Sequence, residues 1–183
     1  NKPLNRLKVI KNDHNIENQN KIQLLSKLGK RISSIQNCNL KDNSKKLVMG
    51  SGDVDSSIML VGEAPGKIED SSGYPFQGDV GSLLKKMLSA INIDLEKVYL
   101  TYSINFRPPE DRKPTAQEIK RYSVFLKEHI SIINPKIVIL LGSTAMEAVT
   151  GLTNRISNER GEWKEIIIKD KTLPLIITYS PSY

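Results

Sequence analysis

The stretch Ile58-Met59-Leu60-Val61-Gly62-Glu63-Ala64-Pro65-Gly66 places a short apolar run directly before a loop rich in glycine and proline. Apolar runs of this length that are bounded by turn residues are typical of buried strands. The loop carries an acid, Glu63, and an aromatic residue, Phe76, follows it. A strand that delivers a carboxylate into such a loop near an aromatic ring is typical of a site for a small planar group. The stretch therefore predicts both the centre of a sheet and a candidate site.

Strands and helices are expected to alternate on both sides of this stretch. Apolar runs predict strands at 98–101, 137–141 and 175–178, and a short extra strand or hairpin at 163–168. Apolar residues at helical spacing predict helices over about 21–34, from about Asp79, behind the capping box at 115–118, and from a Ser143 cap to about Val149. The expected fold is therefore a three-layer α/β/α arrangement around a central, mainly parallel four-stranded sheet, with ligands beyond the carboxyl ends of the strands.

Length and composition indicate one globular domain. The chain has 183 residues, of which 38% are hydrophobic and 26% are charged. A basic arm and helix are expected over 1–36 and the main body over 37–183. No apolar run approaches the roughly 20 residues of a membrane-spanning helix, so no membrane partner is expected. No leader is recognisable and Cys38 has no second cysteine to pair with, which together favour the cytoplasm. A monomer is expected.

Positive charge is concentrated at the start of the chain. The formal net charge is +7, and residues 1–50 hold eleven Lys and Arg against three acids, a net charge of +8, whereas the remainder carries −1. Such asymmetry is typical of a protein that binds a phosphate-rich partner. A solvated helical face in a lysine-rich protein is the alternative, and charge alone does not separate the two.

Further short motifs follow the first stretch in order. They are Glu69-Asp70, Pro75-Phe76-Gln77-Gly78, Gly81 with Leu83-Leu84 and Met87-Leu88, Val98-Tyr99-Leu100-Thr101, Arg107-Pro108-Pro109, Arg112, Pro114-Thr115, Asn134-Pro135-Lys136, Leu141-Gly142 and Tyr179-Ser180-Pro181-Ser182. The series resembles the uracil-DNA glycosylase superfamily, and within it the bacterial and archaeal family 4. The resemblance covers roughly residues 38–183.

The resemblance implies a base excision repair enzyme that flips uracil out of DNA and hydrolyses the bond between base and sugar, leaving an abasic site. Such a reaction passes through an oxocarbenium-like sugar, which a carboxylate stabilises while it orients the attacking water. Glu63 matches the family's acid and is expected to be catalytic, with a Glu that only caps the loop as the alternative. Glu69 and Asp70 also match the family, and both catalytic and supporting roles stay open for them.

The resemblance also implies which residues contact DNA, whether single- or double-stranded. The base-binding set is Gly62, Ala64, Pro65, Gly66, Phe76, Tyr102 and Ser180. The set for the DNA backbone is Arg107, Arg112, Pro181 and Ser182. Phe76 is expected to stack on the flipped base, and a core aromatic beside a turn is the alternative. Ordinary exposed turns are the alternatives for the two backbone loops.

One departure from family 4 concerns its iron–sulfur cluster, which four cysteines generally hold. Here Cys38 is the only cysteine, while Ile35, Phe106, and Tyr122 or Ser123 stand where the other three are usual. One thiolate does not build such a cluster, so no cofactor and no metal are expected. An apolar patch around Ile35, Phe106 and Tyr122 is expected instead.

Two further departures concern the chemistry. Tyr102 stands where the family has a base-reading Asn, and Ser180 stands where it has a His. A Tyr offers one hydroxyl in place of an amide that pairs with both a carbonyl and an N–H. The alternative function is therefore a catalytically weak or inactive DNA-binding protein on the glycosylase fold, which recognises damaged or abasic DNA.

Overall fold

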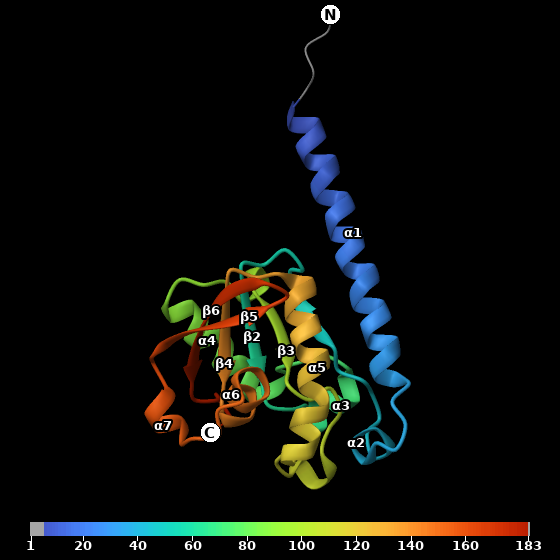
Figure 1. Cartoon of the computed structure of the whole chain (residues 1–183), viewed down its shortest axis with the longest axis vertical. Coiled ribbons are helices and arrows are strands. Elements are labelled where there is room, and N and C mark those ends of the chain that lie inside the picture. Colours follow the sequence, from blue (N-terminus) through green and yellow to red (C-terminus); the bar gives the residue numbers. More distant parts are fainter. Residues whose placement is uncertain (1–5, 183) are drawn as a thin grey trace, which may run out of the picture.

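A mixed β-sheet forms the centre of the computed structural model, which describes residues 6–182, with side chains from residue 16 onward. The strands are β1 (Gly50–Gly52), β2 (Ile58–Gly62), β3 (Tyr99–Tyr102), β4 (Ile137–Leu141), β5 (Trp163–Ile168) and β6 (Lys171–Thr178). Their order across the sheet is β1-β3-β2-β4-β6-β5. Helices lie on both sides of this sheet, so the three-layer α/β/α prediction is confirmed (Figure 1).

The four predicted strands form the parallel part of the sheet. β2 lies between β3 and β4, with Leu60 opposite Leu100 on one side and opposite Ile139 on the other. β6 pairs in parallel with β4. An antiparallel strand extends the sheet at each edge: β1 pairs with β3, and β5 forms a hairpin with β6. The predicted parallel core is confirmed, and the complete sheet is wider than predicted.

Helices occupy the segments between the strands. They are α1 (Arg6–Ser33), α2 (Asn39–Asp42), α3 (Lys67–Ser72), α4 (Gly78–Ala90), α5 (Ala116–Ile133), α6 (Ser143–Thr150) and α7 (Ile156–Glu159), with 3₁₀ turns at Leu95–Lys97 and Pro109–Asp111. The predicted capping box of α5 is present, because the Glu118 N–H donates to Thr115 Oγ1 and the Thr115 N–H donates to the Glu118 carboxylate. The predicted Ser143 cap of α6 is wrong: Gly142 is the N-cap residue, and its φ of 96° is the left-handed conformation that favours glycine.

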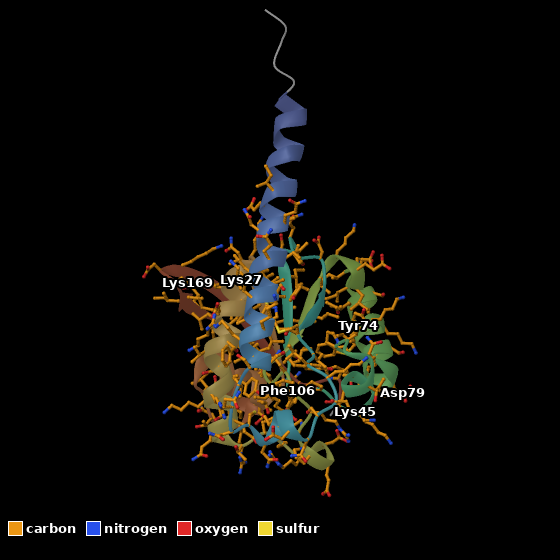
Figure 2. All side chains as sticks on the ribbon, turned by 90° about the vertical axis from the view of Figure 1, so that its right-hand side faces the viewer. Lys27, Lys45, Tyr74, Asp79, Phe106 and Lys169 are labelled. Carbon is orange, nitrogen blue, oxygen red and sulfur yellow. The ribbon has the colours of Figure 1, made fainter. Side chains whose placement is uncertain are left out.

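Helix α1 begins much earlier than the predicted residue 21. No Gly or Pro interrupts the sequence between residue 6 and residue 28, so nothing local stops the helix. Its N-terminal half extends beyond the body of the protein (Figure 1), and Figure 2 shows the same projection from the side. Lys21 Nζ donates to the carbonyl of Ile133 and to Asp55, residues that precede β4 and β2. The projecting half therefore leaves the body at the end where these strands begin. Residues 1–5 of the predicted arm lie outside the described residues.

Three apolar clusters hold the layers together. One packs α5 and α6 against one face of the sheet, and a second packs α4 against the other face. The third joins α1 and α5 to the segment after β3, with Phe106 near the C-terminal end of α1 (Figure 2). Over residues 6–182, no helix combines the length and apolar character that a membrane span needs.

Candidate active site

The carboxyl ends of the parallel strands open onto a cavity of about 440 Å³. Its lining comes from the loop after β2, from α3 and α4, from the end of β3, from the turn around Pro109–Asp111 and from the segment after β6. The lining residues are Gly62, Glu63, Ala64, Pro65, Gly66, Glu69, Phe76, Val80, Tyr102, Pro108, Asp111, Arg112, Lys113, Ser180 and Ser182. The cavity thus lies at the end of the sheet where parallel α/β folds bind ligands.

An aromatic pair forms one wall of this cavity. The rings of Phe76 and Tyr102 are stacked, with centroids 4.7 Å apart and planes inclined by 29°. Gly62 lies directly beneath both rings: a Cβ there would come within 2.7 Å of Phe76 Cζ and 2.9 Å of Tyr102 Cδ1. Phe76 itself has a φ of 52°, an uncommon conformation for a non-glycine residue. Tyr102 covers one face of the Phe76 ring. A ligand can therefore contact only the parts of this ring that Tyr102 leaves uncovered.

The Tyr102 hydroxyl is occupied by neighbouring protein groups. It accepts the Phe76 N–H at 2.9 Å and lies 3.5 Å from Glu69 Oε1. Burial first, and then the charge of the Glu69 carboxylate, raise the pKa of Tyr102 well above its usual value. The hydroxyl therefore keeps its proton at neutral pH. Tyr102 thus acts as a support for Phe76, and its hydroxyl has little capacity left to recognise a base.

Glu69 and Asp70 are both buried and hold main-chain groups in place. Glu69 accepts the N–H groups of Gly66 and Gln77 at 3.0 and 2.9 Å, which ties the loop after β2 to the start of α4. Asp70 accepts the Lys45 N–H at 2.8 Å, and the side chain does not line the cavity. Both acids therefore have supporting contacts, and only Glu69 also reaches the cavity.

Glu63 is half-buried on the loop that leaves β2. Its Oε2 accepts a hydrogen bond from the hydroxyl of Thr144, the second residue of α6. The carboxylate borders the main cavity and also a smaller one of about 190 Å³, which extends toward Gly142 and Tyr179. Within residues 16–182, whose side chains are described, Glu63 Oε1 receives no hydrogen bond. The carboxylate is thus held at one oxygen and available to a ligand or water at the other.

Basic side chains lie at the rim. Arg112 lines the cavity and forms a double ion pair with Glu118, which lowers the pKa of that carboxyl. Lys113 lines both cavities. Arg107 instead pairs with Asp111 at 2.7 Å and does not line the main cavity. The rim is therefore positive at Lys113, whereas Arg107 is engaged by its own loop.

The segment after β6 closes the opposite side of the cavity. Ser180 and Ser182 both line it, and their hydroxyl oxygens lie 2.7 Å apart. The Ser182 N–H also donates to Ser180 Oγ. Pro181, between them, does not line the main cavity. The turn therefore presents hydroxyl groups to the site, whereas the proline shapes the turn.

Most of the predicted site residues meet at this cavity. Those that do are Gly62, Glu63, Ala64, Pro65, Gly66, Glu69, Phe76, Tyr102, Arg112, Ser180 and Ser182, and those that do not are Asp70, Arg107 and Pro181. The main-chain N–H of Gly66, a member of the predicted base-binding set, already donates to Glu69. Sequence reasoning missed the contact of Thr144 with Glu63. The one available signal was that Thr144, a hydroxyl residue, follows β4 at the same edge of the sheet where Glu63 follows β2.

The residues that are expected to stand in place of the cluster cysteines also meet in one place. Cys38, Phe106 and Tyr122 are buried in a single apolar cluster against which Ile35 packs, so the expected apolar patch is confirmed. The Cys38 sulfur lies 3.4 Å from the Tyr122 hydroxyl oxygen. With one thiol present and aromatic rings filling the space, these residues do not fit an iron–sulfur cluster.

Comparison with known proteins identifies relatives of this chain. The family model described as Uracil DNA glycosylase superfamily matches residues 49–183. The Type-4 uracil-DNA glycosylase of Thermotoga maritima is 36% identical over 162 residues, which cover 88% of this chain and 83% of that protein. The Type-4 uracil-DNA glycosylase of Archaeoglobus fulgidus is 32% identical over 165 residues, with the same coverage of 88% and 83%. A DNA polymerase of Bacillus phage SP01 is 34% identical over 128 residues, which cover 69% of this chain and 14% of the polymerase.

Proposed function

The chain belongs to the uracil-DNA glycosylase superfamily, in its type-4 branch, and on that premise we propose that it removes uracil from DNA by hydrolysing the N-glycosidic bond. One observation carries the proposal. Glu63 and Phe76 line the same cavity at the carboxyl end of the sheet, one as a carboxylate and the other as an aromatic wall. A flipped nucleotide needs both features, because the base must be sheltered and the sugar acquires positive charge.

Glu63 is proposed as the catalytic carboxylate. As the bond to the base lengthens, the sugar becomes an oxocarbenium-like cation, and a nearby carboxylate lowers the energy of that state. Glu63 also orients a water molecule for addition to C1′. The water oxygen forms the new bond to C1′, the base leaves with the electrons of the old bond, and the proton that the water loses balances the protonation of the base.

Phe76 is proposed as the stacking surface for the extruded base. Tyr102 supports this ring from behind, and Gly62 lets both rings approach the strand end. Hydrogen bonds to the base are assigned to Ser180 and to the main chain of the loop 63–65, since the Tyr102 hydroxyl is already occupied. Glu69 and Asp70 are proposed to shape the loops rather than to take part in the reaction, because their oxygens hold main-chain N–H groups.

The DNA backbone is proposed to run along the rim formed by Arg112, Lys113 and Ser182. Lysine and arginine side chains position DNA by binding phosphates, and small hydroxyl residues approach phosphates closely. We propose that a single copy acts on single- or double-stranded DNA.

An alkali-cleavage assay tests the proposal. End-labelled oligonucleotides with one uracil, single- and double-stranded, are incubated with the protein and then heated in alkali, which breaks the strand at abasic sites. Breaks are expected at the uracil, and Glu63→Gln is expected to slow their formation by about 10²–10³-fold, the usual effect of removing one electrostatic stabiliser. Glu165→Gln, on the exposed face of β5, is the matched control and should keep the wild-type rate.

Two outcomes would contradict the proposal. Strand breaks that persist undiminished in Glu63→Gln would remove the carboxylate from the mechanism. Tight, salt-sensitive binding to uracil-containing or abasic DNA without any breaks would favour the non-cleaving DNA-binding protein instead.

A further inference from the structure

Thr144 is the second residue of α6, a helix that begins directly after β4. The turn between the two is tight, because Gly142 has a φ of 96° and its N–H donates to the carbonyl of Thr178 on the neighbouring strand. This geometry aims the start of α6 at the loop that follows β2. Thr144 is 4% exposed, and its hydroxyl donates to Glu63 Oε2.

The other acids that line the cavity have several partners. Glu69 accepts two main-chain N–H groups and lies 3.5 Å from the Tyr102 hydroxyl, and Asp111 pairs with Arg107. Among the side chains of residues 16–182, the hydroxyl of Thr144 is the one donor that reaches the Glu63 carboxylate. A half-buried carboxylate with a single protein hydrogen bond depends on that bond for its orientation. A hydrogen bond shielded from water by burial is also stronger than an exposed one.

We propose that Thr144 is a positioning residue, which fixes the Glu63 carboxylate so that one oxygen is held by α6 and the other faces the reacting sugar. The inference rests on the proposed function, in which Glu63 stabilises the cationic sugar and orients the water. Small misplacements of a group that acts in the transition state are costly in rate. The N-terminus of α6 also stabilises the negative charge of the Glu63 carboxylate, because helix N-termini carry partial positive charge.

Kinetics of two variants test this role. Thr144→Val keeps the shape of the side chain and removes the hydroxyl, and it is expected to lower kcat by about 10–100-fold, with KM for the uracil-containing strand changed by less than about threefold. Thr144→Ser keeps the hydroxyl and should stay within about threefold of the wild-type kcat. A role in packing alone predicts the reverse order, because Ser leaves a methyl-sized gap that Val does not.

Thr150→Val is the matched control on the same helix. Thr150 Oγ1 donates to the Met146 carbonyl at 2.7 Å and accepts the Leu152 N–H, so the substitution removes a half-buried hydroxyl that does not touch Glu63. It should leave kcat unchanged, whatever it does to the melting temperature. A kcat for Thr144→Val as high as that of Thr150→Val would overturn the proposal.

A binding measurement separates this inference from the proposed function. Two duplexes are compared, one with a cationic pyrrolidine in place of a sugar and its base, and one with the neutral tetrahydrofuran analogue. A well-placed Glu63 carboxylate should favour the cationic duplex, and Thr144→Val should lose most of that preference, as Glu63→Gln does, whereas Thr144→Ser and Thr150→Val keep it. If the wild type shows the preference but no strand breaks, the proposed function fails and the positioning role stands. If the wild type shows no preference, or if Thr144→Val keeps it, the positioning role is wrong.

Discussion

The ring of Tyr102 lies against the ring of Phe76, and its hydroxyl accepts the main-chain N–H of the same Phe76 at 2.9 Å. One side chain thus fixes both the ring and the backbone of its neighbour. Phe76 has a left-handed backbone conformation that few non-glycine residues adopt, so it needs such support. Tyr102, which is expected to replace the family's base-reading Asn, helps to build the cavity wall here.

Removing the Tyr102 hydroxyl should therefore destabilise the protein. Tyr102→Phe keeps the stacked ring but leaves the Phe76 N–H without its acceptor, which is expected to lower the free energy of unfolding by about 1–3 kcal/mol. Urea unfolding monitored by circular dichroism measures the change. Tyr74→Phe is the control, because Tyr74 is 60% exposed, and it should unfold at the wild-type midpoint. Equal stability of the two variants would show that the hydroxyl of Tyr102 contributes nothing.

Gly62 should tolerate no larger residue. The Cβ of Gly62→Ala would lie 2.7 Å from Phe76 Cζ, and overpacking of this kind typically costs about 1–3 kcal/mol. Displaced rings would also narrow the cavity, so the rate of uracil release should fall in parallel. Gly29→Ala, within α1, is the matched control. Its Cβ would lie an ordinary 3.5 Å from Met49 Cγ. Because alanine has a better helix propensity than glycine, this substitution should raise the free energy of unfolding by up to about 1 kcal/mol. Thermal unfolding of the two variants should shift in opposite directions.

The predictable part of the fold is the part that local sequence specifies. β2 and β4 are uninterrupted apolar runs, and α5 carries its capping box in sequence, so each was recognisable without tertiary information. β1 was missed because Gly50–Gly52 has no side-chain pattern and is defined by its pairing with β3. The early start of α1 was missed because a polar helix lacks an apolar stripe to reveal it.

The same division applies to the site. Glu63 and Phe76 were recognisable because they belong to a motif in which residue type and spacing are specific. The contacts of Asp70 and Thr144 depend on segments that are distant in sequence, Lys45 for one and Glu63 for the other. Arg107 was assigned to DNA from the resemblance, but its position four residues before Asp111 was sufficient for an ion pair within the loop.

Acid should destabilise the protein through His129. Burial lowers the pKa of His129 to about 4, and Nε2 lies 2.9 Å from the Tyr99 hydroxyl oxygen. In the unfolded chain the imidazole has its ordinary pKa of 6.5 and binds the proton more tightly than in the folded protein. The neutral imidazole therefore contributes folding stability that is complete above about pH 6.5. This contribution is lost as the pH falls toward 4. The loss is roughly 3 kcal/mol over this range. Urea unfolding between pH 7.5 and 4.5 measures it, and His129→Gln should flatten the pH dependence. An unchanged slope in that variant would place the acid sensitivity elsewhere.

Lys113 should make the strongest single contact with the DNA backbone. Arg107 and Arg112 are both engaged in ion pairs, with Asp111 and Glu118. Lys113 has no ion-pair partner among the side chains of residues 16–182, and it borders both cavities. A lysine that binds one phosphate releases about one counterion. Lys113→Gln, in a Glu63→Gln background that prevents turnover, should weaken DNA binding and reduce the slope of log K against log salt by about 1.

Lys169→Gln is the control for this measurement. It also removes one positive charge, but Lys169 lies in the turn between β5 and β6, across the molecule from Lys45 and Asp79 (Figure 2). Its salt slope should equal that of the Glu63→Gln parent, because overall charge contributes far less than a direct phosphate contact at salt concentrations where the Debye length is about 10 Å. Equal losses in the two variants would mean that DNA senses only the net charge, and the proposed path of the backbone past Lys113 would be wrong.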